Sequence, residues 1–405
     1  MPRSGAPWWM YVVAGLFILT FLFNARQEFW GPASGGWIPE PSLFKVARVL
    51  PGGPMDKAGI HAGDVLEAVD GYALNGAGNW FLARAHFERN RPIDLQVQRG
   101  EQHLALKLII AEPVWRTWNG SQFLAAIALQ VARSVLLLLA MFVGFSRPQQ
   151  LSARLAALMF GIGSVAEGYP SAGWAAALHH LPAVLAIPIG LTTASGILAA
   201  VVWLMLFASF PRPWFSQRLR CVLGVAPGVV FGIPIVASVI ALIYTPSALA
   251  RPWPVVLSAA PVRLIQDVAG VTPLLFLNKF PMYQPIAQIR LLEVWLAVTL
   301  IYFAASFLIL VAGYRRLDNP RQRRSAGALI LVQVLFALLV LHNLLVRNWA
   351  SWFGTKPPNL FSDAGFVGAA LLLLAVPLTI AYCVLSDGPH ARDNKPGAKS
   401  DATGC

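Results

Sequence analysis

The side chains of this chain that have the right types for catalysis lie in or beside long apolar segments. Ser195, in "TTASGIL", and His342, in "VLHNLL", are of the types that form a nucleophile and base pair. Serine in such segments usually bonds its own helix backbone or helps helices to pack, so we do not expect catalysis.

The adjacent His179 and His180 are predicted in a loop and lack a glutamate at the spacing of a His-Glu-x-x-His zinc helix. We expect a solvated or interfacial role for them, with loose metal binding as the alternative. The sequence therefore predicts no enzymatic activity, no metal site and no cofactor.

The composition indicates the medium in which these residues lie. Of 405 residues, 57% are hydrophobic and 12% are charged, which is too little charge to cover a soluble protein of this size. We expect an integral membrane protein in contact with the lipid bilayer. The excess of 13 positive charges falls in short clusters beside apolar runs. There, Lys and Arg set topology, so nucleic acid is not an expected partner.

Apolar segments long enough to cross a bilayer recur along the chain. A helix needs about 20 apolar residues to cross a hydrocarbon core of about 30 Å. The candidate segments are residues 8–23, 122–145, 153–169, 183–209, 221–244, 293–314, 325–346 and 365–386. The first is not followed by a small-x-small cleavage pattern, so we expect it to stay as a membrane anchor. The predicted fold is an α-helical polytopic membrane bundle of about eight spans.

Arg133 and Glu167 are charged residues within or near the second and third predicted spans. Ionisable groups in lipid are costly and tend to face the interior of a bundle. A pair between them would tie the two spans together, which we favour over a ligand site.

Basic residues predict which loops face the cytoplasm, because Lys and Arg resist translocation. They gather in the loops after the second, fourth and sixth spans, which are alternate loops and so share one side. They are Arg147, Arg154, Arg212, Arg218, Arg220, Arg315, Arg316, Arg321, Arg323 and Arg324. If that side is the cytoplasm, both termini are inside and residues 26–120 are outside.

Residues 34–112 have the pattern of a small water-soluble domain. "FKVARVL" alternates apolar and polar residues like a half-buried strand, and "PGGP" ends it. "MDKAGI" fits one helical turn closed by Gly59, and "GDVLEAVDG" fits a strand that ends in a tight turn at 70–71. "NWFLARAHFER" predicts a helix over 79–89, and "PIDLQVQRGEQHLALKLII" predicts two strands around 99–100. The predicted order is strand, short helix, strand, helix, hairpin, in a small α+β domain.

The stretch "PGGPMDKAGIHAGDVLEAVDG" resembles the core of a bacterial PDZ domain. That family has a Pro-Gly-small-Pro turn, an Ala-Gly helix end, and Gly-Asp before a strand that closes on Asn-Gly or Asp-Gly. The resemblance covers roughly residues 36–110. Gly59 and Gly63 permit tight backbone geometry, and Asp64 can accept hydrogen bonds from loop amides.

The PDZ resemblance implies a peptide groove between the strand after Gly36 and the helix at 79–89. PDZ domains bind a peptide as an added strand, and loop amides hold its terminal carboxylate. The implied peptide-binding residues are Gly36, Trp37, Ile38, Trp80 and Arg84. Pro39 and Pro41 depart from the family pattern, because proline removes strand amides where a ligand would pair. Arg84 is then expected to attract the carboxylate. A purely structural domain, or tryptophans packed at the bilayer interface, are the alternatives.

The larger arrangement is similar to the sensory half of bacterial membrane histidine kinases of the competence type and of PP2C-type phosphatases. The expected parts are an N-terminal anchor (1–25), a PDZ-like domain (34–112), a seven-span helical domain (120–387) and a disordered cytoplasmic tail (388–405). Because no output domain follows the last span, we expect a separate cytoplasmic output protein.

These patterns predict a non-enzymatic membrane receptor or signalling-input protein. Its PDZ-like domain is expected to bind an extracytoplasmic peptide or protein, and its location to be the bacterial inner membrane. The alternatives are a transporter-like or scaffold membrane protein and an intramembrane protease. A transporter should show broken helices in paired half-repeats, and "GVAPGVVFGIP" has no matching partner, which favours the receptor.

Overall fold

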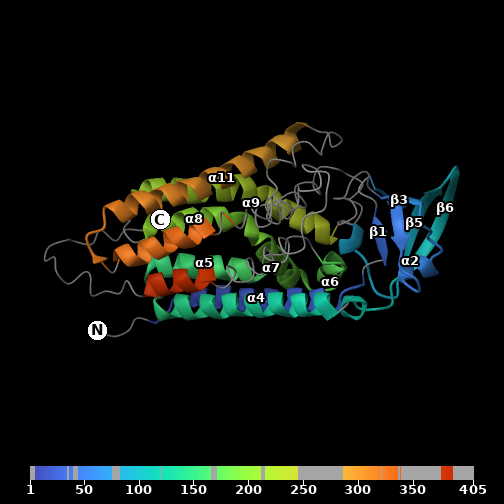
Figure 1. Ribbon diagram of the computed structural model, residues 1–405, viewed down its shortest axis with the longest axis horizontal. Coiled ribbons are helices and arrows are strands. Elements are labelled where there is room, and N and C mark those ends of the chain that lie inside the picture. Colours follow the sequence, from blue (N-terminus) through green and yellow to red (C-terminus); the bar gives the residue numbers. More distant parts are fainter. Residues whose placement is uncertain are drawn as a thin grey trace.

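The computed structural model consists of a helical bundle with a small β-sheet domain at one end (Figure 1). The structure describes residues 5–33, 36–39, 44–74, 83–118, 120–165, 171–210, 215–244, 286–320, 322–335, 338 and 375–385. The predicted spans at 325–346 and 365–386 lie partly outside the described residues. The predicted tail, 388–405, lies wholly outside them.

The helices of the bundle lie lengthwise beside one another (Figure 1). They are α1 (Trp8–Trp30), α4 (Gly120–Ser146), α5 (Leu151–Val165), α6 (Trp174–His179), α7 (Ala183–Thr193), α8 (Ala199–Ser209), α9 (Gln217–Tyr244) and α11 (Ile286–Arg315). Within the described residues, α1 and long parts of α4 and α11 are apolar enough to cross a membrane. The bent pair α7 and α8 makes a fourth span if it is counted as one. These helices agree with a membrane protein, but they are fewer than the eight spans predicted.

The first helix is part of the bundle and is longer than the predicted anchor. It continues from the apolar run through Asn24 to Trp30. Phe17 of α1 is buried with Ile162 of α5 and Val202 of α8. Gly161 allows this approach, because a Cβ at that position would lie 2.8 Å from the Phe17 ring. Small residues at such crossings let helix backbones come close in a membrane.

The sheet domain, residues 31–114, follows the predicted order of elements closely. Its elements are β1 (Trp37–Pro39), β2 (Val46–Val49), α2 (Pro54–Lys57), β3 (Val65–Val69), β4 (Tyr72–Ala73), β5 (Pro92–Arg99) and β6 (Gln102–Ile109), and η1 (Val114–Thr117) leads from it into the bundle. β1 pairs with β2, and the second sheet has the order β4-β3-β5-β6. All the pairs are antiparallel. Asp70 and Gly71 both have positive φ in the β3–β4 turn, as predicted for this tight-turn pair.

The predicted helix at 79–89 is wrong at its end. Within its described part, 83–89, residues 83–85 are helical, and the chain turns at His86. The N–H groups of His86 and Phe87 bond the carbonyls three residues before them, which is a tightened last turn. Residues 75–82 lie outside the described residues.

Alternation along the strands explains the core of the sheet domain. In β5, Ile93, Leu95 and Val97 are buried, whereas the residues between them are exposed. This period of two puts one face of the strand inside. Val46 and Leu66 are buried in the same core, as the sequence pattern predicts.

Gly59 provides a test of the α2–β3 turn. Its φ is +81°, and no atom of the described residues lies within 4 Å of a Cβ built there. Strain in a Gly59→Val variant therefore comes from the left-handed backbone, and we expect a loss of about 2 kcal/mol in the free energy of unfolding. Gly59→Asn should lose less, because asparagine tolerates this conformation. Pulse proteolysis of the sheet domain within the intact chain measures both. Equal losses for the two variants would contradict the backbone explanation.

Candidate functional site

A short strand follows Gly36 and lies in a two-stranded sheet. Gly36 has φ +74°, and its carbonyl accepts a hydrogen bond from the Leu50 N–H at 2.8 Å. A Cβ there would lie 3.3 Å from Pro54 Cδ. Trp37 and Ile38 follow as the first two residues of β1. β1 pairs with β2, and no described strand pairs with its other edge.

Arg84 lies on the described part of the predicted groove helix. Its side chain is half-buried, and burial lowers the pKa of its guanidinium. Ala83 and Phe87, on either side of it, are buried in the same core as Val46 of β2. The helix and β2 therefore share one core. Trp80, the remaining predicted groove residue, lies outside the described residues.

A buried ion pair fixes the loop between α2 and β3. The Asp64 side chain is 1% exposed and accepts two hydrogen bonds from Arg99, both at 2.8 Å. It also accepts the His61 N–H at 2.8 Å, so Asp64 bonds a loop amide as predicted. Arg99 also donates to the Gly59 carbonyl at 2.6 Å. Burial raises the pKa of the Asp64 carboxyl, but the bonds from Arg99 and His61 and their charges outweigh it, and the net pKa is lowered.

The sheet domain is docked on the bundle through the turn that precedes α6. The Gly173 N–H donates to the Arg84 carbonyl at 2.8 Å. Gly173 has φ +76°, and a Cβ there would lie 2.7 Å from Pro32 Cδ and 2.8 Å from the Phe87 carbonyl oxygen. The segment that carries Arg84 therefore touches the bundle directly.

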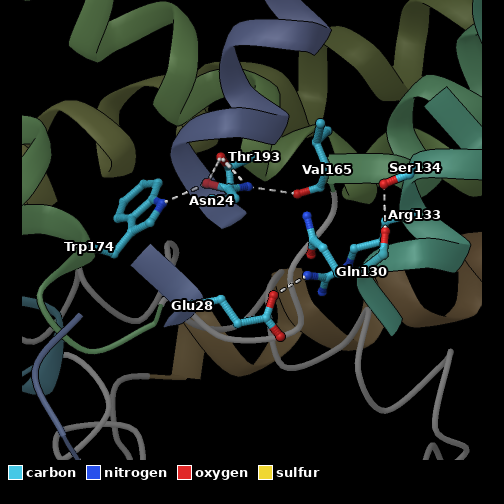
Figure 2. Close-up of polar contacts among 8 residues, drawn as sticks. All are labelled: Asn24, Glu28, Gln130, Arg133, Ser134, Val165, Trp174 and Thr193. Carbon is cyan, nitrogen blue, oxygen red and sulfur yellow. Dashed lines mark hydrogen bonds and ion pairs between the residues drawn. The ribbon is translucent and has the colours of Figure 1, made fainter. Parts of the chain in front are cut away.

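The residue after this turn enters a buried polar cluster in the bundle (Figure 2). Trp174 donates its indole N–H to Asn24 Oδ1 at 3.3 Å. Asn24 Nδ2 donates to the Val165 carbonyl at 3.0 Å and to Thr193 Oγ1 at 3.3 Å. Asn24 is 3% exposed, so these bonds satisfy an amide that would be costly to bury unpaired. The cluster joins α1, α5, α6 and α7.

An ion pair lies beside this cluster. Arg133 of α4 donates to Glu28 of α1 at 2.7 Å (Figure 2). The pair of Arg133 and Glu28 ties α4 to α1. The predicted partner of Arg133, Glu167, lies outside the described residues. Both the nitrogen and the oxygen of the Gln130 side-chain amide are buried, and neither has a hydrogen-bond partner among the described residues.

Sequence reasoning missed Asn24, Glu28, Thr193 and Trp174 as interior polar residues. A signal was present, because Asn24 and Glu28 are four residues apart and lie on one face of a helix. The segment "NARQEFW" had been taken to follow the membrane span. The structure continues the helix through it, which brings both polar residues into the bundle.

The helix pair α7 and α8 is broken at a 3-10 segment, η2 (Ala194–Leu198), and bends by 64°. Thr193, which bonds Asn24, is the last residue before the break. The sequence "GVAPGVVFGIP" lies in the fifth predicted span, whereas this break lies in the fourth. Ser195 donates its hydroxyl to the Thr192 carbonyl at 2.6 Å, the backbone bond expected of a serine in a span. His342 lies outside the described residues.

His179 is the last residue of α6 and is helical where a loop was predicted, whereas His180 lies in the turn that follows. The His179 ring contacts the ring of Tyr244, and its Nδ1 lies 3.1 Å from the Ile243 carbonyl oxygen. Within the part of the chain that the structure describes, no group of three or more His, Cys, Asp or Glu residues is arranged to hold a metal ion.

The fold is a mostly helical bundle, which includes helices long and apolar enough to cross a membrane, with a small antiparallel sheet domain at one end (Figure 1). No family model matches the chain, and no solved structure matches it. A stretch of 89 residues is 35% identical to "Putative serine protease HhoA" of Synechocystis sp.. That similarity covers 22% of this chain and 23% of the relative. This chain therefore spans about a quarter of the relative's length.

This similarity contradicts the expectation that the chain is not an enzyme. The relative is named as a serine protease, and the match, although weak and partial, points toward an enzymatic function. The expectation was wrong in its reasoning as well. It rested on the absence of known catalytic spacings, which excludes only the mechanisms that use those spacings.

Proposed function

We propose that this protein captures peptides at a bacterial inner membrane and acts in proteolysis. Its sheet domain is PDZ-like and binds an extended peptide or protein segment outside the cytoplasm. The observation that carries the proposal is the β1 edge. β1 follows the left-handed Gly36, and among the described strands it pairs with β2 alone. An extended ligand can add to such an edge as another strand.

The ligand's contacts follow from this edge. The Gly36 carbonyl bonds β2, and successive residues of an antiparallel strand face opposite edges, so it is the Trp37 backbone that offers hydrogen bonds to a ligand at the free edge. Pro39 has no N–H to donate. A short edge gives little affinity, so side-chain recognition must supply the rest. Arg84 is partly withdrawn from water, and a cation in that state attracts a carboxylate more strongly than an exposed one. We therefore assign the terminal carboxylate of the ligand to Arg84, and an apolar side chain to Trp37, Ile38 and Trp80.

The bundle is the part that receives the binding event. Arg84 is joined through its carbonyl to Gly173, and the next residue bonds Asn24 inside the bundle. A shift of the groove helix would therefore change the contacts between α1 and α7. We propose that a separate cytoplasmic protein completes the response, and that about eight spans carry it. Placing the sheet domain outside the cytoplasm follows from the arginine clusters in alternate loops.

Cleavage of the captured segment is the second candidate function. The similarity to a serine protease favours it, and that similarity equally suits a protein that presents segments to a protease. Measuring capture and cleavage in one assay separates these two roles.

The test uses the full chain in nanodiscs and a library of random decapeptides with free C-termini. We expect enrichment of a peptide class, and binding weakened by about 10-fold or more when the C-terminus is amidated or Arg84 is changed to Glu. Mass spectrometry of the bound peptides reports cleavage. Lys107→Glu is the matched control, because this exposed lysine on β6 gives the same charge change away from β1. Failure to enrich any peptide, or equal binding by the Arg84→Glu and Lys107→Glu proteins, would refute capture at this groove.

A further inference from the structure

The segment that carries His86 contacts the bundle on both sides of this histidine. The Arg84 carbonyl accepts the Gly173 N–H, and His86 follows at the end of the groove helix. Two residues further on, Glu88 Oε1 lies 3.8 Å from Nε2 of His180. The two bundle histidines are neighbours, with ring centroids 6.1 Å apart. The sheet domain therefore meets the bundle at a cluster of titratable rings.

The surroundings of His86 favour its neutral form. Burial, and to a smaller degree the charge of His179, lower the pKa of His86 to about 4. A proton added to His86 therefore enters a site that is poor in water and lies near a second histidine.

We propose that this histidine cluster is an acid-sensitive latch, which releases the sheet domain from the bundle when His86 is protonated. Protonation places a charge between the groove segment and α6. Separation of these two surfaces brings water back to that charge. The release itself does not depend on the proposed function. Only its effect on peptide binding rests on that function. Release would break the bond from Gly173 to the Arg84 carbonyl and free the segment that carries the carboxylate-binding residue.

Glu88 acts in the opposite sense, but weakly. Protonation of His180 would strengthen its contact with Glu88. However, the His180 side chain is 66% exposed, and Glu88 also bonds Arg91 at 3.0 Å. An exposed pair whose carboxylate is shared contributes little. The ring of Tyr244 contacts the His179 ring on the other side.

The direction and size of the effect follow from linkage. A histidine with a lowered pKa in the docked state contributes docking stability that is complete above the ordinary value of about 6.5 and falls as pH falls toward 4. If His86 regains its ordinary pKa on release, the opening equilibrium constant rises about 30-fold from pH 8 to pH 5.

Hydrogen exchange of the Gly173 amide measures this opening, because that N–H bonds the Arg84 carbonyl across the junction. In the full chain without peptide, we expect its protection factor, corrected for the intrinsic rate, to fall about 30-fold between pH 8 and pH 5. The Leu66 amide, bonded to the Phe44 carbonyl within the sheet domain, should keep its protection.

Two variants identify the titrating group. His86→Gln and His86→Phe should each remove the pH dependence at Gly173, and either suffices if the other fails to fold. His103→Gln is the matched control, because His103 pairs with Glu67 on the exposed side of the sheet and should leave the pH dependence unchanged. A Gly173 protection factor that does not change with pH, or that changes equally in the His86 variants, would overturn the latch. Because no peptide is present, that result would leave the proposed capture function standing.

Discussion

Replacing Gly173 with alanine should destabilise the junction between the sheet domain and the bundle by about 2–5 kcal/mol. One part of this is backbone strain, because φ at Gly173 is +76° and a left-handed alanine costs about 1–2 kcal/mol. The other part is overpacking, typically about 1–3 kcal/mol, since the new Cβ would lie 2.7 Å from Pro32 Cδ. The Phe87 carbonyl, at 2.8 Å, belongs to the backbone and cannot rotate away.

The measurement is the melting temperature of the purified chain, together with exchange of the Gly173-to-Arg84 hydrogen bond. Gly228→Ala is the matched control. Gly228 lies in α9, and nothing is within 4 Å of a Cβ built there. Alanine also suits a helix better than glycine, so this control should be neutral or stabilising. Equal melting temperatures for the two variants would show that the turn before α6 does not hold the sheet domain.

The sheet domain was predictable because its sequence carries local signals at nearly every turn. Gly59 and the pair Asp70-Gly71 have the positive φ that their residue types suggest. Alternation placed Leu95 and Val97 in the core. Such signals act over a few residues, so a single sequence contains them. The end of the helix at 85 was missed. The Arg84 carbonyl there accepts both the Phe87 N–H and the Gly173 N–H, and the second bond comes from a distant part of the chain that helix propensity does not register.

The junction and the polar cluster were not predictable in the same way. The bond from Asn24 to Thr193 joins residues 169 positions apart, and no local pattern indicates such a pair. Arg133 was correctly seen as a charge that needs a partner inside the bundle. Its partner is Glu28, which had been assigned to the loop after the first span. The position at which the first helix ends therefore determines whether Glu28 is available to pair with Arg133.

The candidate groove was predictable from the sequence only in part. Gly36 and the strand after it were found from the family pattern, and Arg84 lies on a helical segment as that pattern implies. The contact of Arg84 with Gly173 was not foreseen, because the resemblance covers the sheet domain alone. The roles of Trp37, Ile38, Trp80 and Arg84 in peptide binding stay predictions.

Replacing Asp64 with asparagine should lower the free energy of unfolding of the sheet domain by about 2 kcal/mol at neutral pH. Asparagine keeps the shape of the side chain, but its NH₂ group can no longer accept the bonds that Asp64 takes from Arg99 and the His61 N–H. A buried polar group that loses its partner costs about 1–3 kcal/mol. Arg99 reaches solvent, so its own charge can rehydrate, which keeps the loss below that of a fully buried pair.

The pH dependence of this loss separates a charge effect from a packing effect. The pKa of Asp64 is lowered in the folded protein, so the ionised carboxylate contributes stability above its unfolded pKa of about 3.9. That contribution is lost as the pH falls through the lower folded value. The wild-type and Asp64→Asn proteins should therefore differ by a constant amount from pH 7 to about pH 5 and converge below about pH 4. Glu101→Gln, which removes an exposed carboxylate at the β5–β6 turn, should change stability little at any pH. A difference between wild type and Asp64→Asn that persists unchanged at pH 3 would mean that the shape of the loop, and not the charge of Asp64, holds α2 against β3.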